Sequence, residues 1–354
     1  MNTILGRTAF SVGDRPYTWQ DVVLAAIVRG DWMAIEQQAR LGLALVQWAD
    51  ESDNSPTEPD VDTAGEEFRY ERELVTAEEM EAWLERCGLT IEEWMDYIER
   101  AVLRRRFADC PDEVDEDAVE GDEIRACVLA EAICDGELAR FADTLAAHAA
   151  VAACAAEENA AEGAPHSSKD LETVVERALR TLSDSGLDIP AEDCRERMAE
   201  LARQEQVFRG ASRAWLTDDA IRAQVEAHHL DWIRLEVREI AFADEAAARE
   251  AALCLREDGA TLESVANDAH APVREGRYYL DETDPETRPM LLSAGPDELV
   301  GPLSLSDGFH LLLVREKIMP SDQDADIRRR AEETLVSSLS EQEAQSRVRW
   351  HERV

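Results

Sequence analysis

Residues 235–241 read LEVREIA, and residues 308–314 read GFHLLLV. In the first stretch apolar and polar side chains alternate, which is typical of a β-strand with one buried face. The second stretch is a short apolar run after a glycine, which is consistent with a strand buried on both faces. We therefore expect these two stretches to be the first and last strands of a small sheet.

The sequence between these two strands predicts five further elements. Their patterns indicate, in order, a helix, a second helix, a strand, a short helix and a short strand, at residues 245–256, 262–269, 274–280, 286–293 and 299–303. A mixture of short strands and helices of this kind favours a small α+β domain over residues 233–318.

Most of the remaining sequence has helical spacing. Thr76-x-x-Glu79 and Thr90-x-x-Glu93 are capping boxes, and Gly88 between them is placed to end the first helix. We expect these two helices to pack as a hairpin. The fold class predicted for the whole chain is therefore α+β: a mainly helical region, a small α/β domain, and a C-terminal helix over residues 324–350.

The helical pattern occurs twice. Residues 23–32 (VLAAIVRGDW) align with residues 128–138 (VLAEAICDGEL) if one insertion is allowed, and residues 87–91 correspond to residues 185–189. The pattern predicts two similar helical units, over residues 16–109 and 122–210. The alternative is that helical hairpins resemble one another by chance.

Domain boundaries follow from changes in composition. Stretches rich in acidic residues, or in glycine, proline and serine, lie at residues 50–67, 110–122 and 157–168, and such segments are expected to be mobile linkers. The predicted organisation is two helical units, an α/β domain and a C-terminal helix that packs back on the helical region, at residues 1–115, 116–230, 231–320 and 321–354.

The charge balance restricts the possible partners. The 354 residues include 37 Lys and Arg against 78 Asp and Glu, which gives a net charge of −41. Such a chain repels phosphate backbones and anionic lipid headgroups, so we expect no nucleic-acid or membrane partner. No glycine-rich phosphate loop, serine-nucleophile motif or metal-ligand spacing occurs in the sequence, and we expect no cofactor or metal.

Several short motifs together resemble the parvulin-type peptidyl-prolyl isomerase domain. They are VREI at 237–240, the alanine-rich helix at 246–256, GATL at 259–262, VGP at 300–302, and GFHLLLV at 308–314, which is similar to the family's closing GYHIIKV. The helical part is similar to the chaperone half of SurA-like proteins, and residues 10–18 resemble the short strand and turn that begin that half.

This resemblance implies a site, and the sequence departs from it. The family usually carries a histidine in the first strand, a cysteine or aspartate in the second, and a histidine in the last. Here Glu239 stands at the first position, EGRYY at residues 275–279 supplies no cysteine or aspartate, and His310 alone remains. The resemblance implies that the first and last strands are neighbours, so we expect Glu239 and His310 to form a carboxylate–imidazole pair in a degenerate active site. The alternative is that Glu239 lies on a solvated face of its strand and His310 packs elsewhere.

Four residues are candidates for binding substrate. Met290 and Leu291 fall where the family's short helix lines a proline pocket, Phe309 precedes His310, and Arg277 lies in the altered second strand. For the apolar residues, ordinary core packing is the alternative.

The resemblance implies a peptide-binding chaperone, and the absence of a recognisable signal sequence leads us to expect a cytoplasmic one. Its client would be a peptide or an unfolded polypeptide, neutral to basic in charge because the chain is acidic. The chain also resembles cytoplasmic proteins of this kind encoded in bacterial gene clusters, and this resemblance implies a role in maturing a ribosomally made peptide, with a partner enzyme. The alternatives are an active peptidyl-prolyl cis-trans isomerase and a non-catalytic scaffold subunit of a peptide-modifying complex.

Overall fold

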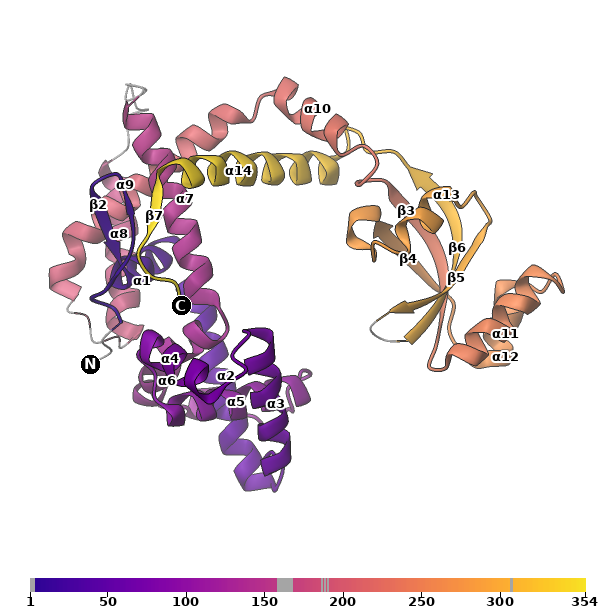
Figure 1. Cartoon of the computed structure of the whole chain (residues 1–354), viewed down its shortest axis with the longest axis horizontal. Helices are drawn as coiled ribbons and strands as arrows, with labels where there is room; N and C mark the ends of the chain where they lie inside the picture. The colour runs from indigo at the N-terminus through magenta and orange to yellow at the C-terminus, as the bar shows by residue number, and fades with distance from the viewer. Residues whose placement is uncertain (1–3, 158–167, 186, 188, 190, 306–307) are drawn as a thin grey trace. The chain divides into compact units, whose positions relative to one another are not determined.

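The computed structural model describes all residues except 1–3, 158–167, 186, 188, 190 and 306–307. The chain is mixed α+β, mostly helical, with two small antiparallel sheets (Figure 1). It divides into two compact units. The first unit comprises Met1–Ala214 with Leu339–Val354, and the second comprises Trp215–Ser338. Helix α14 (Ala325–Arg347) begins in the second unit and ends in the first.

The first unit consists of helices and one three-stranded sheet. Its elements are β1 (Thr8–Val12), β2 (Arg15–Thr18), α1 (Trp19–Arg29), α2 (Trp32–Ser52), α3 (Glu58–Glu71), α4 (Ala77–Cys87), α5 (Ile91–Arg106), the 3-10 helix η1 (Glu116–Ala118), α6 (Gly121–Cys134), α7 (Glu137–Glu157), α8 (Ser168–Ser185), most of α9 (Ala191–Trp215) and β7 (Val348–Trp350).

The sheet of the first unit joins the two ends of the sequence. Strand β1 pairs antiparallel with β2 and, on its other side, with β7, so that Phe10 lies opposite Trp350. The Phe10 ring stacks on Tyr17 at a centroid distance of 4.8 Å. The strand and turn expected at residues 10–18 are therefore confirmed as a hairpin.

The predicted helix boundaries in the first unit follow their capping residues. Thr76 and Thr90 accept hydrogen bonds from the backbone N–H of Glu79 and Glu93, at 3.2 and 3.1 Å. Gly88 ends α4 with a φ of 67°, in the left-handed region that glycine adopts without strain. Both expected helices are present, and each packs a tryptophan, Trp83 or Trp94, on Phe68. That they pack on one another as a hairpin stays a prediction.

The prediction of a mobile linker at residues 50–67 is wrong. Helix α2 continues to Ser52 and α3 begins at Glu58, so most of this segment is helical. The Asp60 carboxylate accepts a hydrogen bond from the Thr57 backbone N–H at 2.9 Å, which caps α3. The buried Phe68 then packs edge-on to Trp83 and Trp94, so burial of this ring offsets the acidic surface of the helix.

The predictions of mobile linkers at residues 110–122 and 157–168 have different outcomes. Within residues 110–122 the structure has the helix η1, and Val119 is buried with 4% of its surface exposed, so this segment is partly packed rather than wholly mobile. Most of residues 157–168 lie outside the described residues.

The two aligned stretches adopt the same local shape. In each, a shorter helix (α1 or α6) is followed at once by a helix of 21 residues (α2 or α7). Gly30 and Gly136 lie at the two corners with φ values of 98° and 77°. The origin of both units from a duplication stays a prediction.

The second unit confirms the predicted order of elements over residues 233–318. It contains α10 (Asp218–Ala227), β3 (Arg234–Phe242), α11 (Glu245–Arg256), α12 (Leu262–Ala269), β4 (Arg274–Tyr279), the 3-10 helix η2 (Leu280–Glu282), α13 (Arg288–Ser293), β5 (Leu299–Leu305), β6 (Gly308–Ile318) and most of α14. The strands form one antiparallel sheet in the order β4-β3-β6-β5.

This sheet separates two small cores. Ile240 and Leu311 pack with residues of α11 and α12 on one face, whereas Val237 and Leu312 pack with Leu291 of α13 on the other. Side chains of alternate residues along β3 and β6 therefore enter different cores.

Within the described ranges, none of the helices combines the length and the apolar character needed to span a bilayer.

Candidate functional site

Glu239 and His310 lie on the same face of the second unit's sheet. His310 of β6 is opposite Ala241 of β3, so Glu239 is its diagonal neighbour on that face. The distance from His310 Nδ1 to Glu239 Oε2 is 3.5 Å, and both residues are buried, with 3% and 8% of their surfaces exposed. The carboxylate–imidazole contact expected from the sequence is therefore present.

A third residue, which the sequence analysis missed, completes this group. The Tyr278 hydroxyl donates a hydrogen bond to Glu239 Oε2 at 2.5 Å. Tyr278 belongs to β4, where the resemblance implies a cysteine or aspartate. We refer to Glu239, Tyr278 and His310 as the Glu239 cluster.

Tyr278 reaches Glu239 because of a glycine. Along β4 its backbone is opposite Leu235, four residues from Glu239, so the ring must lie along the strand. It does so over Gly276: a Cβ there would lie 2.8 Å from Tyr278 Cε2 and 3.0 Å from Val237 Cγ2. A small residue two positions before an aromatic residue was the available signal in the sequence.

The Glu239 cluster reduces the cost of a buried carboxylate. An ionised carboxylate without partners is costly to remove from water. Glu239 has a short hydrogen bond from a phenol and an imidazole at ion-pair distance. The cluster contains no thiol or amine nucleophile, so what it offers a ligand is hydrogen bonding and charge.

Strand β5 comes close to the backbone of this cluster at Gly301. Gly301 has a φ of 120°, and a Cβ there would lie 2.5 Å from the His310 carbonyl oxygen. The Gly301 carbonyl accepts a hydrogen bond from Arg256 Nη2 at 2.8 Å. The VGP motif thus provides the glycine that lets β5 approach the backbone of His310.

The short helix α13 covers the same face of the sheet. Leu291 is 1% exposed and packs in the core that Tyr278 also contacts. Its neighbours Met290 and Leu292 are 48% and 42% exposed. Of the two residues predicted here to bind substrate, Met290 is accessible and Leu291 is part of the core, while Leu292 is an accessible apolar residue that the sequence analysis missed.

Phe309 and Arg277, the other two residues predicted to bind substrate, do not join the Glu239 cluster. Adjacent residues of a strand point to opposite faces, so Phe309 faces away from His310 and Arg277 away from Tyr278. Phe309 packs in the core with α11 and α12, and Arg277 Nε donates a hydrogen bond to Glu236 Oε1 at 3.0 Å. A substrate role for either residue would belong to the other face of the sheet.

Metal binding gains no support from the described part of the chain. No group of three or more His, Cys, Asp or Glu side chains is placed there to hold an ion.

Comparison with solved structures finds peptidyl-prolyl isomerases and SurA-like chaperones. The peptidyl-prolyl isomerase PrsA of Bacillus anthracis matches with 14% identity and a TM-score of 0.32, covering 56% of this chain and 92% of that chain. The foldase PrsA of Streptococcus pneumoniae matches with 13% identity and a TM-score of 0.28, covering 58% and 84%.

A SurA-like chaperone of Campylobacter jejuni matches with 10% identity and a TM-score of 0.19, covering 52% of this chain and 78% of that chain. No protein-family model matches the sequence, and no curated protein sequence matches it either.

Proposed function

We propose that this protein is a peptide-binding, chaperone-like protein whose parvulin-like domain has weak or no isomerase activity. The observation that carries the proposal is the Glu239 cluster: its buried carboxylate and phenol stand where the resemblance implies an imidazole and a cysteine or aspartate. Beside it, α13 exposes two apolar side chains, Met290 and Leu292.

The chemistry of prolyl isomerisation explains why this change matters. The reaction breaks no covalent bond, but its barrier is about 18–20 kcal/mol. An enzyme lowers this barrier only by binding the twisted amide more tightly than the planar isomers. A buried carboxylate stabilises a different charge distribution from an imidazole, whereas an apolar surface binds a client in either isomer.

A protease-coupled assay with a standard Xaa-Pro peptide tests the catalytic part of the proposal. We expect turnover far below that of a typical parvulin, and an increase in Glu239→His, which returns an imidazole to the first strand. Glu236→His is the matched control, because Glu236 lies on the same strand but faces away from His310. Turnover by the unmodified chain at the level of a typical parvulin would contradict the proposal and favour an active isomerase.

Suppression of aggregation of a chemically denatured client tests the binding part. Met290→Ser and Leu292→Ser together should weaken suppression, because they remove accessible apolar surface from α13. Leu253→Ser is the control: Leu253 is 53% exposed but lies on α11, which covers the other face of the sheet. Equal loss in the control and the double variant would indicate that α13 has no special role.

The preferred client in this proposal is neutral to basic and rich in apolar residues. The net charge of −41 attracts basic segments and repels acidic ones. Binding of a basic peptide should therefore weaken as salt is raised across the range in which the Debye length falls from about 10 Å to about 3 Å. Titrations with a basic and an acidic peptide of equal length measure this effect, and equal affinities would contradict it.

We also propose that the protein acts in the cytoplasm on a ribosomally made peptide, together with a modifying enzyme. The seven cysteines support the first part, since all seven are free thiols in the structure. Isolation of the protein from its own cells, with identification of what co-purifies in fixed proportion, tests both parts. Recovery with periplasmic or secreted proteins alone would overturn them.

A further inference from the structure

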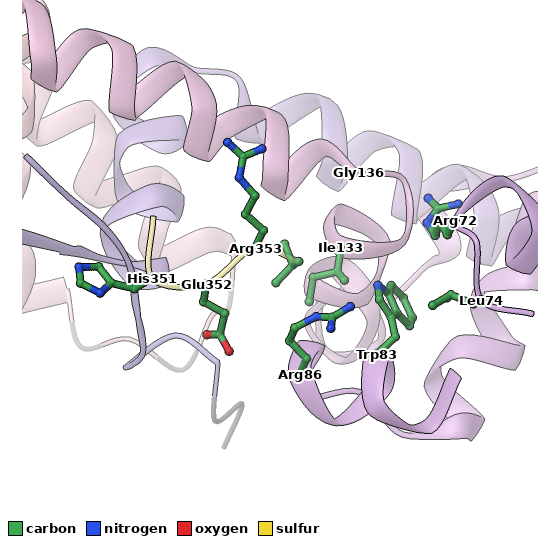
Figure 2. Close-up of a pocket in the computed structure, with 10 residues that line it drawn as sticks. Arg72, Leu74, Trp83, Arg86, Ile133, Gly136, His351, Glu352 and Arg353 are labelled. Carbon is green, nitrogen blue, oxygen red and sulfur yellow. The ribbon is translucent and has the colours of Figure 1, made fainter. Parts of the chain in front are cut away.

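The first unit contains a cavity of about 670 Å³, and all of the residues that line it belong to this unit (Figure 2). Separate segments of the chain form it: the turn before α4, the last turns of α4, the corner between α6 and α7, and the residues that follow β7. This volume is within the range of sites that hold small ligands or a few residues of a peptide.

The cavity is lined by three arginines in a chain that is otherwise strongly acidic. Arg72 is already engaged, since its guanidinium lies 3.8 Å over the Phe68 ring and donates to the Cys134 carbonyl. Arg353 has Asp143 at 3.7 Å. Within the described part of the chain, the guanidinium of Arg86 has neither a hydrogen bond nor an ion pair.

The acidic residue of the cavity is neutralised from within the same unit. Glu352 forms an ion pair with Arg7, which also donates a hydrogen bond to the Arg86 carbonyl oxygen at 2.8 Å. This contact ties Arg7 to the backbone at Arg86 while leaving the Arg86 side chain available. Counted over side chains alone, the lining therefore presents a surplus positive charge to a ligand: three arginines against Glu352.

The rest of the wall is apolar. Leu74, Trp83 and Ile133 have 7%, 5% and 3% of their surfaces exposed. Trp83 is held edge-on against Phe68 at a centroid distance of 5.5 Å, so its indole is a rigid surface. A ligand that fits must combine one negative group with an apolar side chain.

We propose that this cavity binds the C-terminal residue of an extended peptide, with its carboxylate on Arg86 and an apolar side chain against Trp83. Guanidinium and carboxylate form strong charge-assisted hydrogen bonds. Of the three arginines that line the cavity, Arg86 is the one whose guanidinium has no hydrogen bond or ion pair within the described residues, and one guanidinium is enough for one carboxylate. The proposal rests on the proposed peptide-binding function and names the part of the client that is recognised.

Fluorescence anisotropy of the full chain with short, N-terminally labelled peptides ending in leucine tests the proposal. Three peptides are compared: the free acid, its C-terminal amide, and an amide with aspartate before the leucine. We expect the free acid to bind about tenfold more tightly than either amide, which is the value of one charge-assisted hydrogen bond.

Arg86→Gln should remove this preference, and Arg86→Lys should keep part of it. The matched control is Arg180→Gln, because Arg180 is also an exposed helical arginine without an ion pair in the described residues. Arg86 is exposed in the last turn of α4, so its replacement should leave thermal unfolding unchanged.

The possible results separate this inference from the proposed function. Equal binding of free acid and amide overturns the inference and leaves peptide binding intact. Equal binding of the free acid and the aspartate peptide overturns the assignment to a chain end. A preference that persists in Arg86→Gln places the site elsewhere, and failure of all three peptides to bind contradicts the proposed function as well.

Discussion

At the scale of single residues, the geometry of the Glu239 cluster depends on Gly276. The Tyr278 ring occupies the space that a side chain at position 276 would need. The hydroxyl then lies 2.5 Å from the carboxylate of Glu239. Gly276, which has no side chain, thus determines whether the buried carboxylate of Glu239 receives the hydrogen bond from Tyr278.

Gly276→Ala should destabilise the second unit. The added methyl group displaces the Tyr278 ring, which costs about 1–3 kcal/mol for overpacking and for the weakened hydrogen bond. Urea unfolding of the full chain measures the loss. Gly210→Ala is the control: Gly210 lies within α9 with no atom within 4 Å of a Cβ placed there, so alanine should be neutral or slightly stabilising. Equal behaviour of the two variants would show that the Tyr278 ring moves freely.

At the scale of elements, a half-buried polar link joins α7 and α9. His148 Nδ1 lies 2.7 Å from Glu205 Oε2, and the imidazole stacks on the Phe208 ring at 3.6 Å. Burial alone would raise the pKa of Glu205. The hydrogen bonds and charges of His148 and Arg209 outweigh burial and lower the pKa to about 2.

The lowered pKa of Glu205 predicts an acid-dependent loss of stability. Because the folded-state pKa lies below its ordinary value of 4.5, the stabilisation is fully present above that value and disappears as the pH falls toward 2. Urea unfolding at a series of pH values should show a shallower acid-side decline in Glu205→Gln than in the unmodified chain.

Glu196→Gln is the control for this prediction. Glu196 is an exposed residue of the same helix and has no ion pair in the described part of the chain. Its replacement should leave the pH dependence as it is. If both variants follow the unmodified chain, the link between α7 and α9 contributes nothing to folding.

At the scale of the whole molecule, burial controls the reactivity of the thiols. Burial raises the pKa of Cys87 to about 12 and that of Cys127 to about 11, and it raises the pKa of Cys134 as well. A raised thiol pKa leaves less thiolate, which is the reactive form, at neutral pH. Cys110 and Cys254 are only half-buried.

Thiol labelling should therefore proceed in two classes. We expect Cys110 and Cys254 to react with a maleimide well before Cys87, Cys127 and Cys134, as followed by peptide mass spectrometry. In urea, all of them should react at similar rates. Fast labelling of Cys87 in the folded chain would show that the first unit opens readily at the end of α4.

The sequence by itself determined the elements whose signals are local. The caps at Thr76 and Thr90 and the stop at Gly88 are where the pattern predicted them. The order of strands and helices over residues 233–318 follows from apolar spacing in the same way. Two of the three residues of the Glu239 cluster were also predictable, because Glu239 and His310 lie on strands that the resemblance implies to be neighbours.

Only the tertiary structure decided which side chains share a space. Tyr278 reaches Glu239 across a glycine, Phe309 enters the opposite core from His310, and α3 is helical because Phe68 is buried by distant aromatic rings. The cavity of the first unit brings together residues from three regions that are far apart in the sequence, at 72–86, 133–136 and 351–354. Local patterns report the conformation of a segment, whereas burial and contact depend on partners that the chain supplies from elsewhere.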